Sequence, residues 1–124
     1  MTLPASDDEI LLLHNPRCSK SRATEALLQE RGLTFTVRAY LDDPLDRDEL
    51  SELQARLGRP AREWVRSGQD EYRQADLDAN SADGEILDAM AGAPILMERP
   101  IVIRGKEARV GRPPQDVLEL FESE

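Results

Sequence analysis

The single cysteine, Cys18, is the residue whose type and position most clearly indicate covalent chemistry. It follows a short apolar run, Ile10–Leu13, that predicts a buried strand, and a helical pattern begins at about Ser19. At a helix start, unpaired backbone N–H groups and the positive end of the helix dipole stabilise a thiolate. Such surroundings can lower a cysteine pKa from about 8.5 to roughly 3.5–7.5. We therefore interpret Cys18 as a nucleophile in preference to a buried structural thiol.

Basic residues close to this cysteine predict that the same segment attracts an anion. Arg17, Lys20 and Arg22 flank Cys18, and the N–H groups at a helix start also bind anions. The chain as a whole carries a formal net charge of −9, so a local basic cluster is more informative here than in a basic protein. This charge argues against nucleic acid or an anionic membrane as the main partner. The working hypothesis is a nucleophile inside an anion pocket.

The remaining composition limits the class of protein. A chain of 124 residues predicts one domain with a proper core. One cysteine excludes an internal disulfide and a four-ligand zinc site, and we expect no bound metal or cofactor. Residues 1–9 are acidic, resemble no signal peptide and predict a flexible tail, and no run is long enough to span a membrane. We expect a monomer in the reducing cytoplasm.

The elements that position Cys18 begin with a strand, a helix and a second strand. The helix is expected over residues 19–31, followed by a stop at Gly32. The second strand is expected over residues 33–40, where apolar and polar residues alternate. Three elements within about 30 residues predict a βαβ unit with parallel strands. The residues expected to face inward are Ala23, Ala26, Leu27 and Leu28 in the helix, and Leu33, Phe35, Val37 and Ala39 in the strand.

Residues 44–93 predict a helical block. Asp46 and Glu49 resemble a capping box before a helix that ends at Gly58, and Ser81 or Asp83 is expected to cap a later helix. Shorter helices are expected over residues 60–66 and 71–77. The apolar positions expected to be buried are Leu50, Leu53, Leu57, Trp64, Val65, Ile86, Leu87 and Met90.

The last third of the chain returns to strands. Residues 99–104 and 107–110 flank Gly105-Lys106, a plausible hairpin turn, and a last helix follows Pro113-Pro114 with Val117, Leu120 and Phe121 inward. The order β-α-β, helical block, β-β-α predicts an α/β, thioredoxin-like (glutaredoxin-like) fold with a mixed four-stranded sheet. A single domain over residues 10–121 then carries a helical insertion at about 44–93.

Pro100 needs a positional reason, because a proline entering an interior strand removes a donor from the ladder. A cis Arg99–Pro100 bond beside the cysteine would supply that reason, and the sequence leaves its isomeric state open.

Separated motifs together resemble one known family. They are His14-Asn15-Pro16-x-Cys18-x-x-Ser21-Arg22, Arg66, Arg99-Pro100-Ile101-Val102 and Arg112-Pro113. In combination they resemble the arsenate reductases of the glutaredoxin-coupled ArsC family, within the ArsC/Spx superfamily of thioredoxin-like proteins. The resemblance covers roughly residues 10–121, and the pairing of the cysteine loop with the later Arg-Pro-Ile-Val strand is its specific part.

The resemblance implies roles for individual residues. Cys18 would attack arsenate, and Arg66, Arg99 and Arg112 would bind the oxyanion, for which the planar guanidinium fork is suited. The supporting residues would be His14, Asn15, Ser21, Arg22 and Pro100. Whether His14 tunes the thiolate or is structural stays open, and Arg22 could contact the loop or point to water. The choice of Arg66 rests on its place after Trp64-Val65, because Arg59 and Arg62 offer competing registers.

With no second cysteine, the reduction needs an external thiol. The family implies glutathione as co-substrate and glutaredoxin as protein partner, with release of arsenite. One departure leaves the anion preference open: Ser19 and Lys20 stand where the best-known arsenate reductases have a glycine-threonine pair.

Two alternatives remain. The first is a glutathione-dependent thiol oxidoreductase of the same fold with another substrate. The second is a non-enzymatic regulator resembling the Spx-type proteins that bind RNA polymerase. Many of those carry a two-cysteine switch, whereas Ser21 occupies the position three after Cys18 here, which disfavours that reading.

Overall fold

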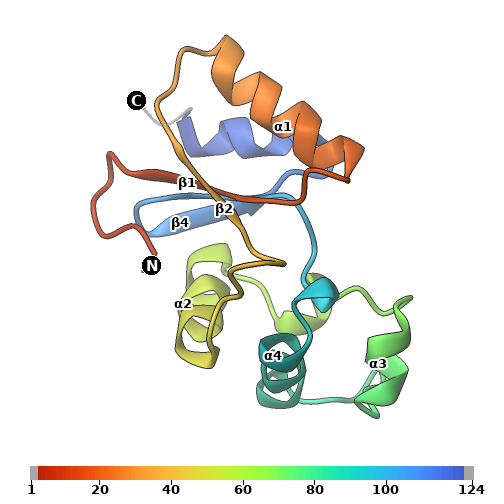
Figure 1. Ribbon diagram of the computed structural model, residues 1–124. Helices are drawn as coiled ribbons and strands as arrows, with labels where there is room; N and C mark the ends of the chain where they lie inside the picture. Colours follow the sequence, from red (N-terminus) through yellow and green to blue (C-terminus); the bar gives the residue numbers. More distant parts are fainter. Residues whose placement is uncertain (1–2, 122–124) are drawn as a thin grey trace. The chain divides into compact units, whose positions relative to one another are not determined.

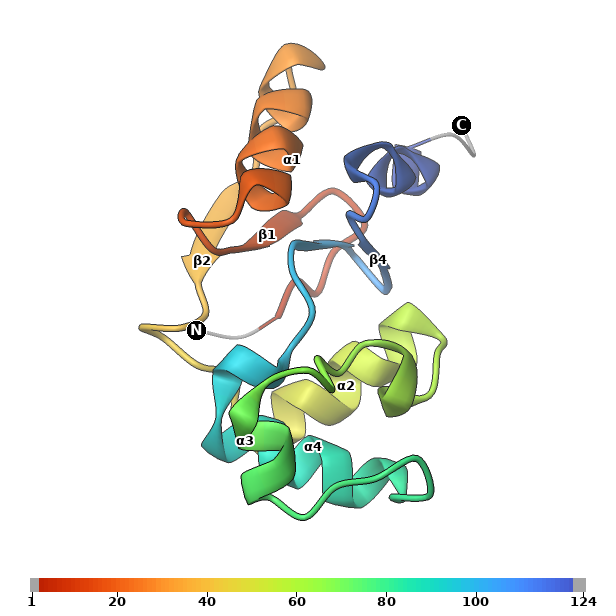
Figure 2. The same ribbon diagram turned by 90° about the vertical axis from the view of Figure 1, so that its right-hand side faces the viewer.

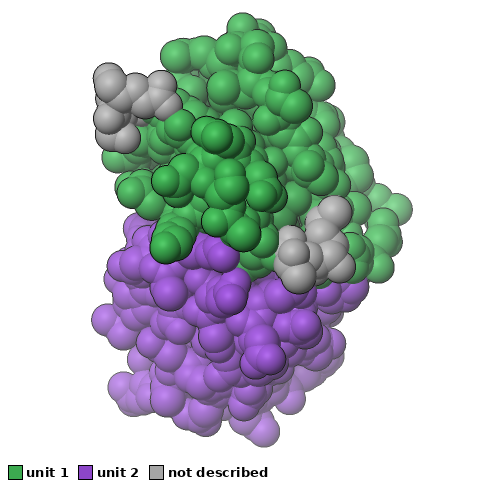
Figure 3. Space-filling model, turned by 90° about the vertical axis from the view of Figure 1, so that its left-hand side faces the viewer, with its two compact units in different colours: residues 1–43, 99–124 green, residues 44–98 purple. Residues whose placement is uncertain are grey.

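The computed structural model describes residues 3–121 of the chain. The chain forms two compact units, coloured separately in Figure 3: residues 1–43 with 99–124, and residues 44–98. The second unit corresponds to the predicted helical insertion and extends to Glu98, beyond the expected end near residue 93. Within residues 3–121, no helix combines the length and the apolar character that a membrane span requires.

The first unit contains the predicted mixed four-stranded sheet (Figure 1). Its strand order is β2-β1-β3-β4, with β1 parallel to β2 and the other neighbours antiparallel. All residues of the central strand β1 are buried, as expected of an interior strand. The predicted βαβ unit and the hairpin are therefore confirmed. The strands are β1 (Ile10–His14), β2 (Thr36–Ala39), β3 (Ile101–Arg104) and β4 (Glu107–Val110).

Two helices cover one face of this sheet (Figure 2). They are α1 (Ser19–Glu30) and the 3₁₀ helix η3 (Pro114–Phe121), which lie against each other. The aliphatic side chains between helices and sheet form the core of the unit and exclude water from it. Its buried members are Ile10, Leu12, Leu28, Val102, Val117 and Leu120, with Leu27, Leu33, Phe35 and Phe121 packed around them.

The buried face of α1 differs from the predicted one. Ala23 and Ala26 are exposed and Leu27 is half-buried, whereas Ser21, Thr24 and Leu28 are fully buried. These three positions follow the spacing of one helix face. The apolar pattern missed this face because two of its three residues carry hydroxyl groups. The Ser21 hydroxyl accepts the Asn15 N–H at 3.2 Å, and the Thr24 hydroxyl lies beside Gly111.

The second strand also departs from its predicted pattern. β2 covers only residues 36–39, and Val37 is 40% exposed whereas Arg38 and Tyr40 are buried. The charge of Arg38 is compensated locally, because its Nε donates to the Asp43 backbone oxygen at 2.9 Å and lies 3.4 Å from an Asp43 carboxylate oxygen. This compensation permits the burial of Arg38, a residue that the alternation predicts to be exposed. Leu33 and Phe35 pack against the core as predicted.

The segment before β1 is bonded to the β3–β4 hairpin in its described part, residues 3–9. The Gly105 N–H donates to the Glu9 backbone oxygen at 3.2 Å, and Arg104 Nε donates to the Asp7 backbone oxygen at 3.1 Å. Gly105 has φ +56, and a Cβ there would lie 2.7 Å from Asp7 Oδ1. Leu3 is 6% exposed. These contacts distinguish the described segment from the unattached tail that its acidic composition predicts.

The second unit is helical, and its first helix matches the prediction closely. The Asp46 carboxylate accepts the Glu49 N–H at 2.8 Å, and the Glu49 carboxylate accepts the Asp46 N–H at 3.1 Å, which completes the capping box. Gly58 ends the helix with φ +66. Leu50, Leu53 and Leu57 are its buried face. The elements are α2 (Arg47–Leu57), η1 (Ala61–Glu63), α3 (Asp70–Gln74), α4 (Asp83–Gly92) and η2 (Pro94–Leu96).

Neither Ser81 nor Asp83 caps α4, contrary to the prediction. Ala82 is the capping position, and the Asp83 carboxylate instead accepts the Ala61 N–H at 3.0 Å and the Gln54 side-chain N–H at 2.8 Å. Asp83 therefore ties three segments of the unit together. Ile86, Leu87 and Met90 form the buried face of α4, as expected.

The unit extends to Glu98 because the chain around Trp64 pairs with the chain after η2. Val65 forms an isolated antiparallel bridge with Met97, and the Glu98 N–H donates to the Trp64 oxygen at 2.9 Å. Trp64 is fully buried, while Val65 is only half-buried.

Candidate active site

Cys18 lies where β1 passes into α1, as the sequence predicts. It is the capping residue of α1, with extended backbone angles (φ −98, ψ 124), and its side chain is half-buried. The Cys18 N–H donates to the Asn15 oxygen at 3.0 Å, and the Arg22 N–H donates to the Cys18 oxygen at 3.0 Å. This geometry directs the first N–H groups of the helix toward the sulfur.

Side chains hold the loop around Cys18 in one conformation. The Asn15 side-chain oxygen accepts the Arg17 N–H at 3.0 Å, and the Ser21 hydroxyl accepts the Asn15 N–H at 3.2 Å. Arg22 Nη1 donates to the Pro16 oxygen at 2.8 Å, so Arg22 contacts the loop rather than only water. Asn15, Ser21 and Arg22 therefore position the thiol through the backbone and do not need to touch a substrate.

The electrostatic surroundings favour the thiolate. Burial of the sulfur is the largest single influence and raises the pKa of Cys18, but hydrogen bonds from the Ser21 and Lys20 N–H groups and the charges of Arg99 and Arg112 outweigh it. The resulting pKa of Cys18 lies below the ordinary value of a thiol. The predicted activation of Cys18 at the helix start thus has four identifiable sources.

Arg99 and Arg112 come to Cys18 from the two ends of the β3–β4 hairpin. Arg112 Nη1 donates to the Arg99 backbone oxygen at 3.1 Å, which joins the two segments. Each arginine precedes a cis peptide bond, Arg99–Pro100 and Arg112–Pro113, so the state that the sequence left open is cis. The structure therefore brings Cys18, Arg99 and Arg112 together within the first unit.

Arg66 lies in the second unit and is held there by backbone. Its N–H donates to the Leu96 oxygen at 2.7 Å, and its Nη1 donates to the Ile95 oxygen at 3.2 Å. Of the competing registers, Arg59 lies 3.1 Å from the Glu63 carboxylate, and Arg62 is exposed. Arg66 is thus the half-buried, backbone-anchored member of the three.

His14 ends β1 and is 7% exposed. Its Nε2 lies 3.8 Å from a carboxylate oxygen of Glu25 on α1, and its Nδ1 is buried with no hydrogen-bond partner among residues 3–121. His14 is not among the groups that shift the pKa of Cys18. Sequence reasoning missed Glu25. The one pattern that could have pointed to it is its position four residues after Ser21, on the same face of the helix.

Gly111 is a second residue that sequence reasoning missed. Its N–H donates to the Pro100 oxygen at 2.9 Å, directly before Arg112 in the chain. A Cβ at this position would lie 2.8 Å from Thr24 Oγ1, 2.9 Å from Pro100 Cγ and 3.3 Å from Val117 Cγ1. A small residue here lets α1, the Pro100 segment and η3 approach one another beside the arginine pair.

Replacing Gly111 by alanine is therefore expected to destabilise the protein by about 1–3 kcal/mol, because the added methyl group overpacks this junction. Urea unfolding measures the change. Gly68→Ala is the control, since nothing lies within 4 Å of a Cβ at Gly68. Equal stability of the two variants would contradict the close packing at Gly111.

Replacing Ser21 by alanine is expected to lower the free energy of unfolding by about 1–3 kcal/mol, because the Asn15 N–H loses its acceptor. Ser19→Ala is a matched control: Ser19 is exposed on the first turn of the same helix and should change stability by less than about 0.5 kcal/mol. Thermal and urea unfolding of both variants measure the difference. A Ser21→Ala protein as stable as wild type would contradict the positioning role of this hydroxyl.

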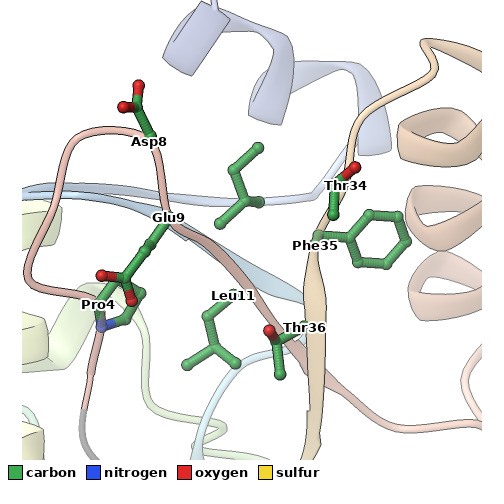
Figure 4. A pocket seen from close by; sticks show the side chains of 8 residues that line it. Pro4, Asp8, Glu9, Leu11, Thr34, Phe35 and Thr36 are labelled. Atoms are coloured by element: carbon green, nitrogen blue, oxygen red, sulfur yellow. The ribbon is translucent and has the colours of Figure 1, made fainter.

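A cavity of about 370 Å³ lies at the start of β1, away from the strand end that leads to Cys18 (Figure 4). Leu11 and Thr36, which are partners in the β1–β2 register, line it together with Glu9 and Thr34. It shares no lining residue with the thiol loop. Among residues 3–121, no three side chains of histidine, cysteine, aspartate or glutamate gather as a metal site requires.

Comparisons with known proteins agree with this arrangement. The chain is 44% identical over 114 residues to an uncharacterized protein, YfgD, of Escherichia coli, which covers 90% of this chain and 96% of the relative. It is 45% identical over 111 residues to an arsenate reductase of Neisseria meningitidis, covering 88% of this chain and 95% of the relative. A solved arsenate reductase from Vibrio cholerae superposes with a TM-score of 0.86 at 39% identity, over 94% of this chain and 99% of that one.

The fold and the family follow from these matches. The structural neighbours confirm the predicted α/β, thioredoxin-like fold with its mixed sheet. The model of the ArsC family matches residues 13–120, which include Cys18, both hairpin arginines and the second unit. The protein belongs to the ArsC family.

Proposed function

We propose that this protein reduces arsenate to arsenite, with the Cys18 thiolate as the nucleophile. The observation that carries the proposal is the stabilised thiolate held beside Arg99 and Arg112. A reactive sulfur next to two guanidinium groups suits attack on a tetrahedral oxyanion better than attack on a neutral electrophile. The names of the Neisseria and Vibrio relatives support the choice of arsenate among oxyanions.

In the first step, the Cys18 thiolate attacks the arsenic atom and forms a sulfur–arsenic bond, while hydroxide leaves as water after taking up a proton. Negative charge is concentrated on the arsenate oxygens as the bond forms. The charges of Arg99 and Arg112 stabilise this state, and we expect Arg66 to supply a third guanidinium. The role of Arg66 is carried over from the family motif.

Reduction then needs two electrons that the protein cannot supply from a second thiol of its own. A first external thiolate forms a second sulfur–arsenic bond and displaces another hydroxide. A second external thiol attacks the sulfur of the first, and the electron pair of the broken sulfur–arsenic bond stays on arsenic, which becomes arsenic(III). The two external thiols leave as one disulfide, and hydrolysis of the remaining sulfur–arsenic bond releases arsenite and restores Cys18.

We assign glutathione as the co-substrate and glutaredoxin as the protein partner, with no bound metal or cofactor. The assignment rests on the family resemblance and on the single cysteine. A reducing cytoplasm would keep Cys18 and the external thiols in the required state, and we propose that the protein works there as a monomer.

The test is arsenite production by the purified protein with arsenate, glutathione and glutaredoxin. We expect a rate well above the same mixture without the protein, and a loss of rate when glutaredoxin is omitted. Arg66→Gln should raise the KM for arsenate about tenfold, whereas Arg62→Gln, an exposed arginine of the same segment, should not change it. A rate equal to the background would contradict the proposed function. If Arg66→Gln and Arg62→Gln had the same KM for arsenate, Arg66 would have no part in binding arsenate.

An alternative activity shares the same thiolate. A glutathione-dependent thiol oxidoreductase would also need Cys18 with a lowered pKa. It would form a mixed disulfide between Cys18 and glutathione without any affinity for oxyanions, which mass spectrometry and arsenate binding would reveal. The arginine pair favours the oxyanion reaction over this alternative.

A further inference from the structure

We propose that Arg17 and Lys20 select the external thiol by its charge, favouring a thiol that carries carboxylates, as glutathione does, over a neutral one. The two residues precede and follow Cys18, and both are exposed. The inference rests on the proposed function, because it assigns residues to the reductant that this function requires. Neither residue belongs to the oxyanion pair described above.

Arg17 and Lys20 lack local charge compensation in the part of the chain that the structure describes. Several arginines of this acidic chain lie against carboxylates, as Arg47 does with Asp88 at 2.7 Å and Arg56 with Glu52 at 3.2 Å. Arg17 and Lys20 have no carboxylate partner within residues 3–121, although acidic residues outnumber basic ones by 25 to 16. Their positive charge therefore faces solvent at the thiol.

The charges of Arg17 and Lys20 differ in role from the pair that acts on the sulfur. The charges of Arg99 and Arg112 help to lower the pKa of Cys18, whereas Lys20 acts on this pKa through its backbone N–H and Arg17 is not among the causes of the shift. Because both side chains are exposed, their charges are accessible to a molecule that approaches the sulfur.

The backbone of both residues is fixed, while their side chains stay accessible. Asn15 accepts the Arg17 N–H at 3.0 Å, and Lys20 is the second residue of α1. Arg22 does not share this role, because its guanidinium is bonded to the Pro16 oxygen. Two outward cations thus stand beside the half-buried sulfur, on an otherwise acidic protein.

The chemistry of the reductant fits this arrangement. At neutral pH glutathione carries two carboxylates and one ammonium group, and its net negative charge is repelled by a protein of charge −9. Local cations raise the concentration of such a thiol where it must attack the arsenic atom bound to Cys18. Exposed charges act mainly on association and are screened by salt, so the effect is expected to fall as ionic strength rises.

The first experiment does not depend on arsenate. Iodoacetate and iodoacetamide both alkylate a thiolate and release iodide, but only iodoacetate is an anion, and Cys18 is the one cysteine they can modify. The ratio of the iodoacetate rate to the iodoacetamide rate should fall about fivefold in the double variant Arg17→Gln/Lys20→Gln. The matched control is Arg31→Gln/Lys106→Gln, which removes an arginine and a lysine that are also exposed and without a carboxylate partner among the described residues. An unchanged ratio in the first double variant would overturn the proposal.

The second experiment measures the reductant during turnover. In Arg17→Gln/Lys20→Gln, the KM for glutathione should rise about fivefold, while the rate with the neutral thiol 2-mercaptoethanol at saturating arsenate stays unchanged. A rise in the KM for arsenate instead would place the two residues in the oxyanion pocket and overturn the proposal. If the wild-type protein reduces no arsenate but the alkylation ratio still falls, the charge selection stands and the proposed function fails.

Discussion

Replacing Cys18 by serine is expected to reduce the rate of arsenate reduction by at least about a thousandfold, to the background without protein. A serine hydroxyl keeps its proton near neutral pH, so the Ser21 and Lys20 N–H groups and the charges of Arg99 and Arg112 have no thiolate to stabilise. Without a thiolate, the covalent bond to arsenic on which the external thiols act does not form. The measurement is arsenite release with glutathione and glutaredoxin.

The control for this prediction is the fold. Cys18 is half-buried at the capping position of α1, where a serine hydroxyl can accept the same helix-start N–H groups, so serine should change the free energy of unfolding by less than about 1 kcal/mol. Far-UV circular dichroism and urea unfolding check this. Arsenate reduction by a folded Cys18→Ser protein at the wild-type rate would show that another group begins the chemistry.

Replacing Arg112 by glutamine is expected to lower kcat/KM for arsenate about 100- to 1000-fold, because a charged donor beside the forming bond is lost. The same change should raise the pKa of Cys18, since one of the charges that lower it disappears. The sign follows from linkage: a higher pKa means less thiolate at any pH below it, so the pH of half-maximal alkylation by iodoacetamide moves upward. Arg99→Gln should behave in the same way.

Two further variants separate charge from geometry. Arg112→Lys keeps the charge but loses the planar fork, so the pKa of Cys18 should stay near the wild-type value while kcat/KM for arsenate still falls. Arg109→Gln is the matched control, because Arg109 lies on β4 and its charge lies within 3.9 Å of Glu107 and Glu119 carboxylates. If Arg112→Gln and Arg109→Gln had the same pH profile and kcat/KM, the arginine pair would have no part in the site.

The reactive loop could be read from the sequence because its causes are local. A strand followed directly by a helix defines where Cys18 must stand, and the capping position determines which N–H groups reach the sulfur. The capping box of α2 and the turn at Gly105 are local in the same sense. Interactions over three or four residues leave a pattern in the chain, and these elements were predicted correctly.

The errors arose where contacts between distant segments decide. Ser21 and Thr24 are buried because the Asn15 backbone and Gly111 lie against them. The pattern of apolar residues in the sequence cannot predict these two neighbours. Arg38 is buried because Asp43 compensates its charge after a turn. Asp83 does not cap α4, because its carboxylate accepts hydrogen bonds from the Ala61 N–H and the Gln54 side chain elsewhere in the unit. Tertiary contacts override local propensity at each of these positions.

The arginine pair was predicted in part: the sequence identified the two residues but not their meeting at Cys18. The motifs around Pro100 and Pro113 named Arg99 and Arg112, but their meeting at Cys18 depends on the hairpin returning beside α1. Gly111 permits that close approach. Because glycine has no side chain, nothing in the sequence provided a chemical reason to assign Gly111 to the site.

The central claim is that arsenate reacts with Cys18 between the arginines. The most direct measurement is a crystal structure of the protein soaked with arsenate, with the arsenic located by anomalous scattering. We expect arsenic at covalent-bond distance from the Cys18 sulfur, with its oxygens bonded to Arg99 and Arg112. Arsenic bound elsewhere, or an occupied thiol loop with both arginines turned away from the oxygens, would contradict the account.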